Sequence, residues 1–196
     1  VLASLLHLFA YFDYIKRVAS AKIKPNSASW AVWALGSVLE AVTYLQVTGD
    51  WQKNLLPVVC SLSAIGIFLF SLVRGHFTRP TTFEWLIIVL DCTALLVWWA
   101  YDSVVYANMF LIFTAVISFV PITYSVWRNP ETENAFPWWL WSIAYVLLSV
   151  VVFIRWEKWE DVIYPLVFLI LHLVIACLAI DSRRQSYGKM KTGKLT

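Results

Sequence analysis

Seven long apolar runs, separated by short polar connections, constrain this chain more than any single motif. A bilayer core of about 30 Å requires about 20 apolar residues per helix. Hydrophobic residues make up 61% of the chain and charged residues 14%, whereas a soluble domain has roughly 45–50% and 25%. We therefore expect an all-α integral membrane protein with seven transmembrane helices. The runs are Val1–Ile15, Ser29–Val47, Leu55–Val73, Phe83–Tyr101, Val104–Trp127, Trp138–Ile154 and Val162–Ile180.

Lysine and arginine lie mostly on one side of these predicted helices. Twelve of them flank that side, and the other side has Lys53, Arg155 and Lys158. The positive-inside rule then places the N-terminus outside and the C-terminus inside, with residues 181–196 as a basic cytoplasmic tail. The net charge of +3 is accounted for by orientation and by contact with the lipid bilayer, so it gives no reason to expect nucleic acid binding.

The chain also matches itself at an offset of 108 residues. This offset aligns four pairs of rare residues without a gap: Trp30 with Trp138, Trp33 with Trp141, Trp51 with Trp159 and Pro57 with Pro165. The offset moves the first three runs onto the last three and leaves the fourth unmatched. Because four crossings separate the copies, both copies face the same way. We expect a first three-helix repeat in residues 1–75, a linker helix in 81–101 and a second three-helix repeat in 104–180.

This arrangement resembles the SWEET and PQ-loop superfamily of small transporters. The resemblance covers nearly the whole chain at the level of architecture. The segments KPNSASWAVW and PITYSVWRNPETENAFPWWLW, with the later Tyr164-Pro165 pair, are similar to uncharacterised bacterial members. The PQ-loop is named after a proline-glutamine pair, and the corresponding pair in this chain is Pro121-Ile122. We expect a multi-pass protein of the bacterial cytoplasmic membrane, with a homo-oligomer and a larger membrane complex as open alternatives.

This sequence lacks residues that several other classes of protein require. A retinal protein needs a lysine in its seventh helix, and Val162–Ile180 has none. No phosphate-binding glycine loop, metal-spaced histidine pair or nucleophile–histidine set is present, so we expect no enzyme activity, no catalytic residues and no cofactor. The three cysteines, Cys60, Cys92 and Cys177, lie inside apolar runs and are interpreted as small core residues, with no metal site.

Four ionisable residues share the central depth of the predicted bundle. They are His7, Glu40, Asp91 and His172. Such groups are costly in hydrocarbon and normally face protein or a water-filled cavity. Asp91 lies on the linker helix, which the resemblance places outside the transport pathway. Because Glu40 is expected at the midplane between the repeats, we expect it to exchange a proton, with His172 as its partner and Asp91 as a further proton-coupling candidate.

Helical spacing places Trp33, Ser37 and Glu40 on one face, with Trp141 and Tyr145 on the matching face of the second repeat. In sugar-carrying members of the superfamily, tryptophans on helices 2 and 6 flank the substrate, which implies this role for Trp33 and Trp141. Those members also place asparagines on helices 3 and 7, where this chain has Ser61 or Ser63 and His172. The predicted substrate-binding residues are Trp33, Ser37, Glu40, Ser63, Trp141, Tyr145 and His172.

Two functions fit these features. The first is a transporter that moves a small polar solute by alternating access between the two repeats, coupled to protons through Glu40. The second is a non-transporting subunit or receptor of the same fold that binds a partner protein or lipid. Several ionisable groups at one depth favour the transporter.

Overall fold

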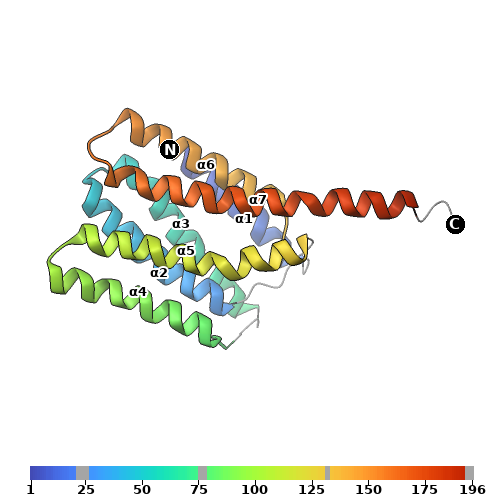
Figure 1. The fold of residues 1–196 in the computed structure, drawn as a ribbon, viewed down its shortest axis with the longest axis horizontal. Coiled ribbons are helices and arrows are strands. Elements are labelled where there is room, and N and C mark those ends of the chain that lie inside the picture. The colour runs from blue at the N-terminus through green and yellow to red at the C-terminus, as the bar shows by residue number, and fades with distance from the viewer. Residues whose placement is uncertain (21–26, 75–78, 131–132, 193–196) are drawn as a thin grey trace.

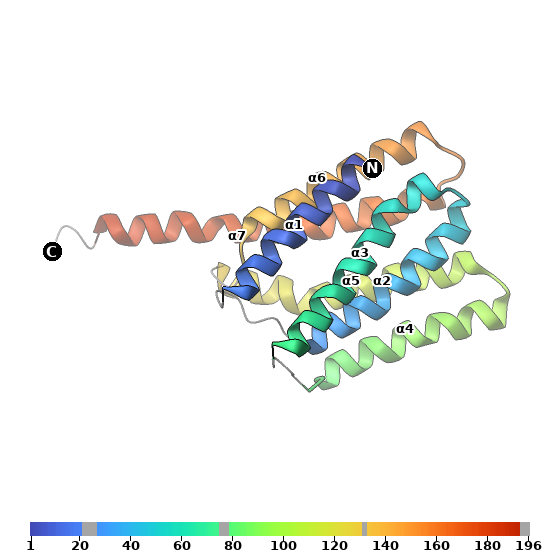
Figure 2. The same cartoon turned by 180° about the vertical axis from the view of Figure 1, so that it is seen from behind.

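The protein is a bundle of helices (Figure 1). The computed structural model describes residues 1–20, 27–74, 79–130 and 133–192, and side chains as far as residue 180. The helices of this part are α1 (Leu2–Ala19), α2 (Ser27–Thr48), α3 (Trp51–Val73), α4 (Thr82–Tyr101), α5 (Val104–Arg128), α6 (Ala135–Ile154) and α7 (Glu160–Thr192). Each contains one predicted apolar run, except that Val1 of the first run precedes α1. Helix α7 continues through most of the predicted basic tail and projects beyond the bundle (Figures 1 and 2).

Six of these helices, α2 to α7, are long and apolar enough to cross a membrane. The expectation of a multi-pass membrane protein is confirmed to this extent. Helix α1 has 18 residues and is outside this set.

At the start of several helices, polar side chains accept hydrogen bonds from backbone N–H groups that have no partner within the helix. Asp50 accepts a hydrogen bond from the Gln52 N–H at the start of α3, and Thr81 and Glu84 form a capping box at the start of α4. Gly49, between α2 and α3, has a φ of 63°. This left-handed conformation favours glycine and allows the tight connection between the two helices.

Helices with corresponding positions in the predicted repeats pack in corresponding ways. Helix α2 packs on α3 as α6 packs on α7, α1 packs on α3 as α5 packs on α7, and α1 packs on α6 as α5 packs on α2. Helix α4 packs on α2 and α5 and lies at one edge of the bundle in both views (Figures 1 and 2). We use "mouth end" for the end at which α2, α4 and α6 begin, and "closed end" for the end at which α3, α5 and α7 begin.

The interpretation of all three cysteines as core residues is wrong for two of them. Cys92 and Cys177 are exposed on the surface of the bundle, and Cys60 is half-buried. An apolar run on a membrane helix has an outward face as apolar as its inward face, so an apolar neighbourhood in sequence does not indicate which way a small side chain points.

Candidate functional site

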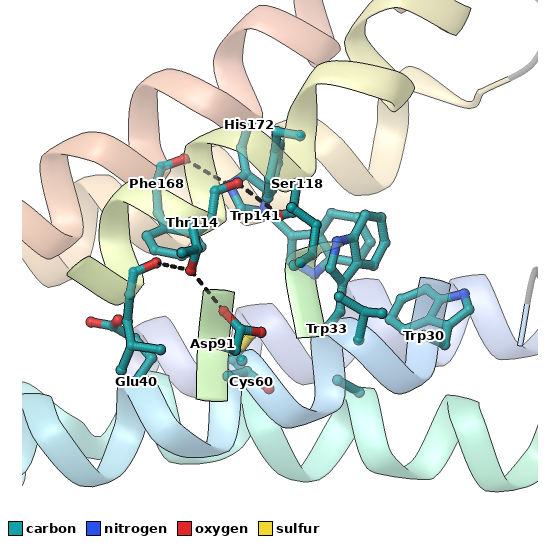
Figure 3. A pocket seen from close by; sticks show the side chains of 18 of the residues that line it. Trp30, Trp33, Glu40, Cys60, Asp91, Thr114, Ser118, Trp141, Phe168 and His172 are labelled. Carbon is teal, nitrogen blue, oxygen red and sulfur yellow. Dashed lines mark hydrogen bonds between the residues drawn. The ribbon is translucent and has the colours of Figure 1, made fainter. Parts of the chain in front are cut away.

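A chamber lies inside the bundle, where residues of all seven helices meet (Figure 3). Its volume is about 90 Å³, which is enough for several water molecules or a small solute. It is lined by Tyr11, Trp30, Val32, Trp33, Gly36, Ser37, Glu40, Cys60, Ala64, Ile87, Asp91, Leu111, Thr114, Ala115, Ser118, Phe119, Trp138, Trp141, Tyr145, Phe168 and His172.

Aromatic rings form much of the chamber wall. The Trp30 and Trp33 rings of α2 lie 5.1 Å apart with an interplanar angle of 85°, and the Trp138 and Trp141 rings of α6 lie 5.1 Å apart at 84°. Residues three apart on a helix share a face, so each pair presents two rings to the same space. The buried indole Nε1 of Trp141 has no hydrogen-bond partner in the described part of the chain and is an unused donor.

Glu40 pairs with Asn108 of α5, not with His172 as the sequence predicted. Asn108 Nδ2 donates to Glu40 Oε1 over 2.8 Å and to Thr43 Oγ1 over 3.0 Å. Both side chains are buried, and the remaining atoms of the pair, Glu40 Oε2 and Asn108 Oδ1, have no partner among the described residues. Since a carboxylate only accepts hydrogen bonds, a proton on Oε2 is needed for that oxygen to donate.

Asp91 lines the chamber from α4, although the linker helix was expected outside the pathway. Thr114 donates to Asp91 Oδ1 over 2.7 Å. A Cβ atom placed on Gly36 would lie 3.0 Å from Asp91 Oδ2, so the missing side chain of Gly36 allows the carboxylate to lie against α2. Figure 3 shows Asp91 near the centre of the view, between Glu40 and Trp33.

His172 completes the set of ionisable residues that line the chamber. Its Nδ1 lies 2.7 Å from the carbonyl oxygen of Phe168, so Nδ1 carries the hydrogen and a neutral ring presents Nε2 as an acceptor. Its ring lies 5.0 Å from that of Tyr145 and 5.9 Å from that of Trp141. Within the described residues, no hydrogen bond joins His172 to Glu40: Glu40 bonds to Asn108, and His172 bonds to the Phe168 carbonyl oxygen.

The remaining predicted residues divide between lining and non-lining positions. Trp33, Ser37, Trp141 and Tyr145 all line the chamber. Ser63 is half-buried and does not line it, because Cys60 and Ala64 occupy the chamber-facing side of α3. For Ser63 the sequence analysis estimated only the depth along α3 and not the face of the helix on which the side chain lies.

The chamber adjoins a wider cavity at the mouth end. This cavity has a volume of about 500 Å³ and shares Trp30, Trp33, Trp138 and Trp141 with the chamber. Glu133, just before α6, lies on its wall and accepts a hydrogen bond from Trp138 Nε1 over 3.1 Å. Burial raises the pKa of Glu133 despite that bond.

Polar bonds connect the two halves of the bundle at the closed end. Lys53 Nζ of α3 lies 2.6 Å from Asp161 Oδ2 of α7, and both side chains are fully buried. Tyr44 of α2 donates to the Asp161 backbone oxygen over 2.6 Å. The rings of Tyr44, Tyr145 and Tyr164 pack beneath these bonds in one apolar cluster.

A second ion pair at this end joins Arg155, which follows α6, to Asp50, which precedes α3. Burial of Asp50 opposes its ionisation, but hydrogen bonds from Arg155 and from the Gln52 N–H lower its pKa below the ordinary value. Lys53 Nζ also lies 3.8 Å from Glu157 Oε1. The closed end thus carries three ion pairs between the predicted repeats among the described residues.

Sequence analysis did not identify Asn108, Lys53 or Asp161 as important residues. Asn108 was detectable as an amide inside the apolar run Val104–Trp127. Lys53 and Asp161 are 108 positions apart, which is the offset of the predicted repeat, so the internal match contained a signal for their pairing.

Comparison of this chain with models of protein families, with curated proteins and with solved structures gave no match.

Proposed function

We propose that this protein is a membrane transporter of a small polar solute that works by alternating access between two three-helix repeats. One observation carries the proposal: an interior chamber with two carboxylates adjoins a wider cavity at the mouth end, while ionic links cross the bundle at the closed end. This arrangement is what a transporter open to one side requires. Positive-inside reasoning assigns the mouth end to the cytoplasm.

The matched packing of α1–α3 and α5–α7 supports the two-repeat mechanism. So does the Lys53–Asp161 pair, since residues at equivalent positions meet each other near a twofold axis. In this proposal one repeat rocks against the other, the closed end opens by breaking its ion pairs, and the mouth end closes as the tryptophan pairs of α2 and α6 approach. Helix α4 joins the repeats.

The Glu40–Asn108 pair supports proton coupling. Asn108 Nδ2 already donates to one carboxyl oxygen, and the two unpartnered atoms belong to the same acid and amide. A proton on Glu40 Oε2 makes that oxygen a donor and removes the cost of a buried, uncompensated charge, so a single proton changes the pair from charged to neutral. We propose Glu40 as the proton carrier and Asn108 as its positioning residue, with His172 and Asp91 lining the adjacent chamber.

The test uses purified protein in liposomes that are incubated with a defined mixture of amino acids, sugars, amines and organic acids, with and without an imposed pH gradient. Mass spectrometry of the vesicle contents identifies the solute that accumulates relative to protein-free vesicles. We expect Glu40→Gln to fold normally and to lose most of the stimulation by the gradient, because glutamine preserves the neutral shape but carries no exchangeable acid.

Asp13→Asn is the matched control, since Asp13 pairs with Arg17 on α1 and lies outside the chamber. It should keep the stimulation. If no solute accumulates with wild-type protein, the transport proposal is wrong and the non-transporting subunit or receptor becomes the better interpretation. If Glu40→Gln keeps the full pH response, proton coupling through Glu40 is wrong.

A further inference from the structure

We propose that the chamber binds a small organic ammonium cation, with the Asp91 carboxylate as its counter-charge. This inference rests on the proposed transport function and specifies the class of solute. It follows from the charge of the chamber, the chemistry of its walls and the placement of its unused polar atoms.

The charge that side chains can bring to the chamber is negative. Glu40 and Asp91 line it, and no lysine or arginine does so within the described residues. Nor does any lysine or arginine of that part of the chain form an ion pair with either acid. A buried carboxylate is costly unless a cation or several hydrogen bonds compensate it. A cationic solute supplies that compensation.

Asp91 is better placed than Glu40 for this role. The Glu40 carboxyl is directed to Asn108, whereas Asp91 is held by the Thr114 hydroxyl through one oxygen. The other oxygen, Oδ2, faces the position where Gly36 lacks a side chain. Asp91 is 3% exposed, so its charge is shielded from bulk water and acts at short range.

The walls suit an organic cation better than a hydrated metal ion. Eight aromatic side chains line the chamber: Tyr11, Trp30, Trp33, Phe119, Trp138, Trp141, Tyr145 and Phe168. The face of an aromatic ring, that of tryptophan most of all, attracts an ammonium group within about 6 Å of its centre. Sodium or potassium would need oxygen ligands to replace its water, and most of this wall is carbon.

The remaining polar atoms define the rest of the solute. The Trp141 side chain lines the chamber, and its indole N–H is buried without a partner in the described part of the chain; in this proposal it donates to an oxygen of the solute. The neutral His172 ring presents Nε2 as an acceptor. The proposed solute therefore combines an ammonium group with a hydroxyl or carbonyl oxygen a few bonds away.

The route to the chamber has the same charge. Glu84 and Glu133 lie on the wall of the mouth-end cavity, and no lysine or arginine lines it among the described residues. Both acids are already hydrogen-bonded, so they do not form a second site. Their negative character favours the entry of cations.

The test measures equilibrium binding of radiolabelled choline to the full chain purified in detergent. The competitors are unlabelled choline, tetramethylammonium, and 3,3-dimethylbutan-1-ol, which has the shape of choline without its charge. We expect saturable binding that unlabelled choline and tetramethylammonium displace, while dimethylbutanol is at least 10-fold weaker and excess sodium chloride has no specific effect beyond that of ionic strength.

Asp91→Asn keeps the acceptor for Thr114 and removes the charge, so choline binding should fall at least 10-fold. Asp13→Asn is the matched control, because Asp13 pairs with Arg17 on the surface of α1; its choline binding should equal that of wild type. Melting curves and gel filtration establish that both variants fold.

Equal displacement by choline and dimethylbutanol overturns the inference, as does unchanged choline binding in Asp91→Asn. Absence of saturable binding by the wild-type protein also overturns it. These failures differ from failure of the proposed function. If the protein binds choline but no solute enters the liposomes, only the transport proposal is refuted. If an uncharged solute enters and choline does not bind, only the inference of a cationic solute is refuted.

Discussion

Replacing Lys53 with methionine tests how much the closed end depends on its buried ion pair. Lys53 and Asp161 are both fully buried, with 2.6 Å between Nζ and Oδ2. The second carboxyl oxygen of Asp161, Oδ1, has no partner among the described residues. Lys53→Met therefore leaves a buried carboxylate without its cation, which costs about 3–5 kcal/mol.

For a chain of this length, about 1 kcal/mol corresponds to roughly 2–4 °C in melting temperature. We expect Lys53→Met to melt roughly 6–20 °C below wild type in detergent, as followed by near-ultraviolet circular dichroism. The double variant Lys53→Met/Asp161→Leu removes both charges and should recover most of that loss, because replacing a buried pair with apolar residues is often neutral or stabilising.

Arg17→Met is the control for the loss of a positive charge from a helix. Its partner is Asp13, and both side chains of that pair are partly exposed, at 29% and 25%. Such a pair contributes about 0–1 kcal/mol, so the melting temperature should fall by no more than roughly 4 °C. A Lys53→Met variant as stable as Arg17→Met, or a double variant as unstable as Lys53→Met, would refute the reasoning about the closed end.

Two further predictions concern Asn108 and Asp50, which lie toward the closed end. Asn108→Leu should destabilise the protein by about 1–3 kcal/mol, because it leaves the buried Glu40 carboxyl without its donor. The double variant Asn108→Leu/Glu40→Leu should recover part of this loss in the same melting assay. A double variant that is less stable than Asn108→Leu would contradict the pairing. Because the pKa of Asp50 is lowered in the folded protein, its contribution to stability is full above the unfolded value of about 3.9 and is lost as the pH falls toward the folded value. The melting temperature of Asp50→Asn should therefore lie below that of wild type at about pH 7 and approach it at about pH 3, and an equal gap at both pH values would show that Asp50 acts only through its shape.

Sequence alone was sufficient to locate the helices. Each predicted apolar run lies within one observed helix except that Val1 of the first run precedes α1. The reason is physical: a membrane-spanning backbone must satisfy its polar groups within each segment, so the length and apolarity of a segment determine a helix almost independently of the rest of the chain. The same period of 3.6 residues placed Trp33 and Glu40 on one face, and both line the chamber.

Only the tertiary structure decided which polar groups meet. Glu40 bonds to Asn108, not to His172, because α5 packs beside α2 and brings an amide to the acid. Asp91 enters the chamber because Gly36 leaves room for its carboxylate. Ser63 does not line it, since Cys60 and Ala64 occupy that side of α3. In a uniformly apolar helix, the sequence gives little indication of rotation about the axis, and rotation is set by packing against neighbouring helices. The depth of a residue thus follows from the sequence of its own helix, whereas its hydrogen-bond partner depends on how two helices pack.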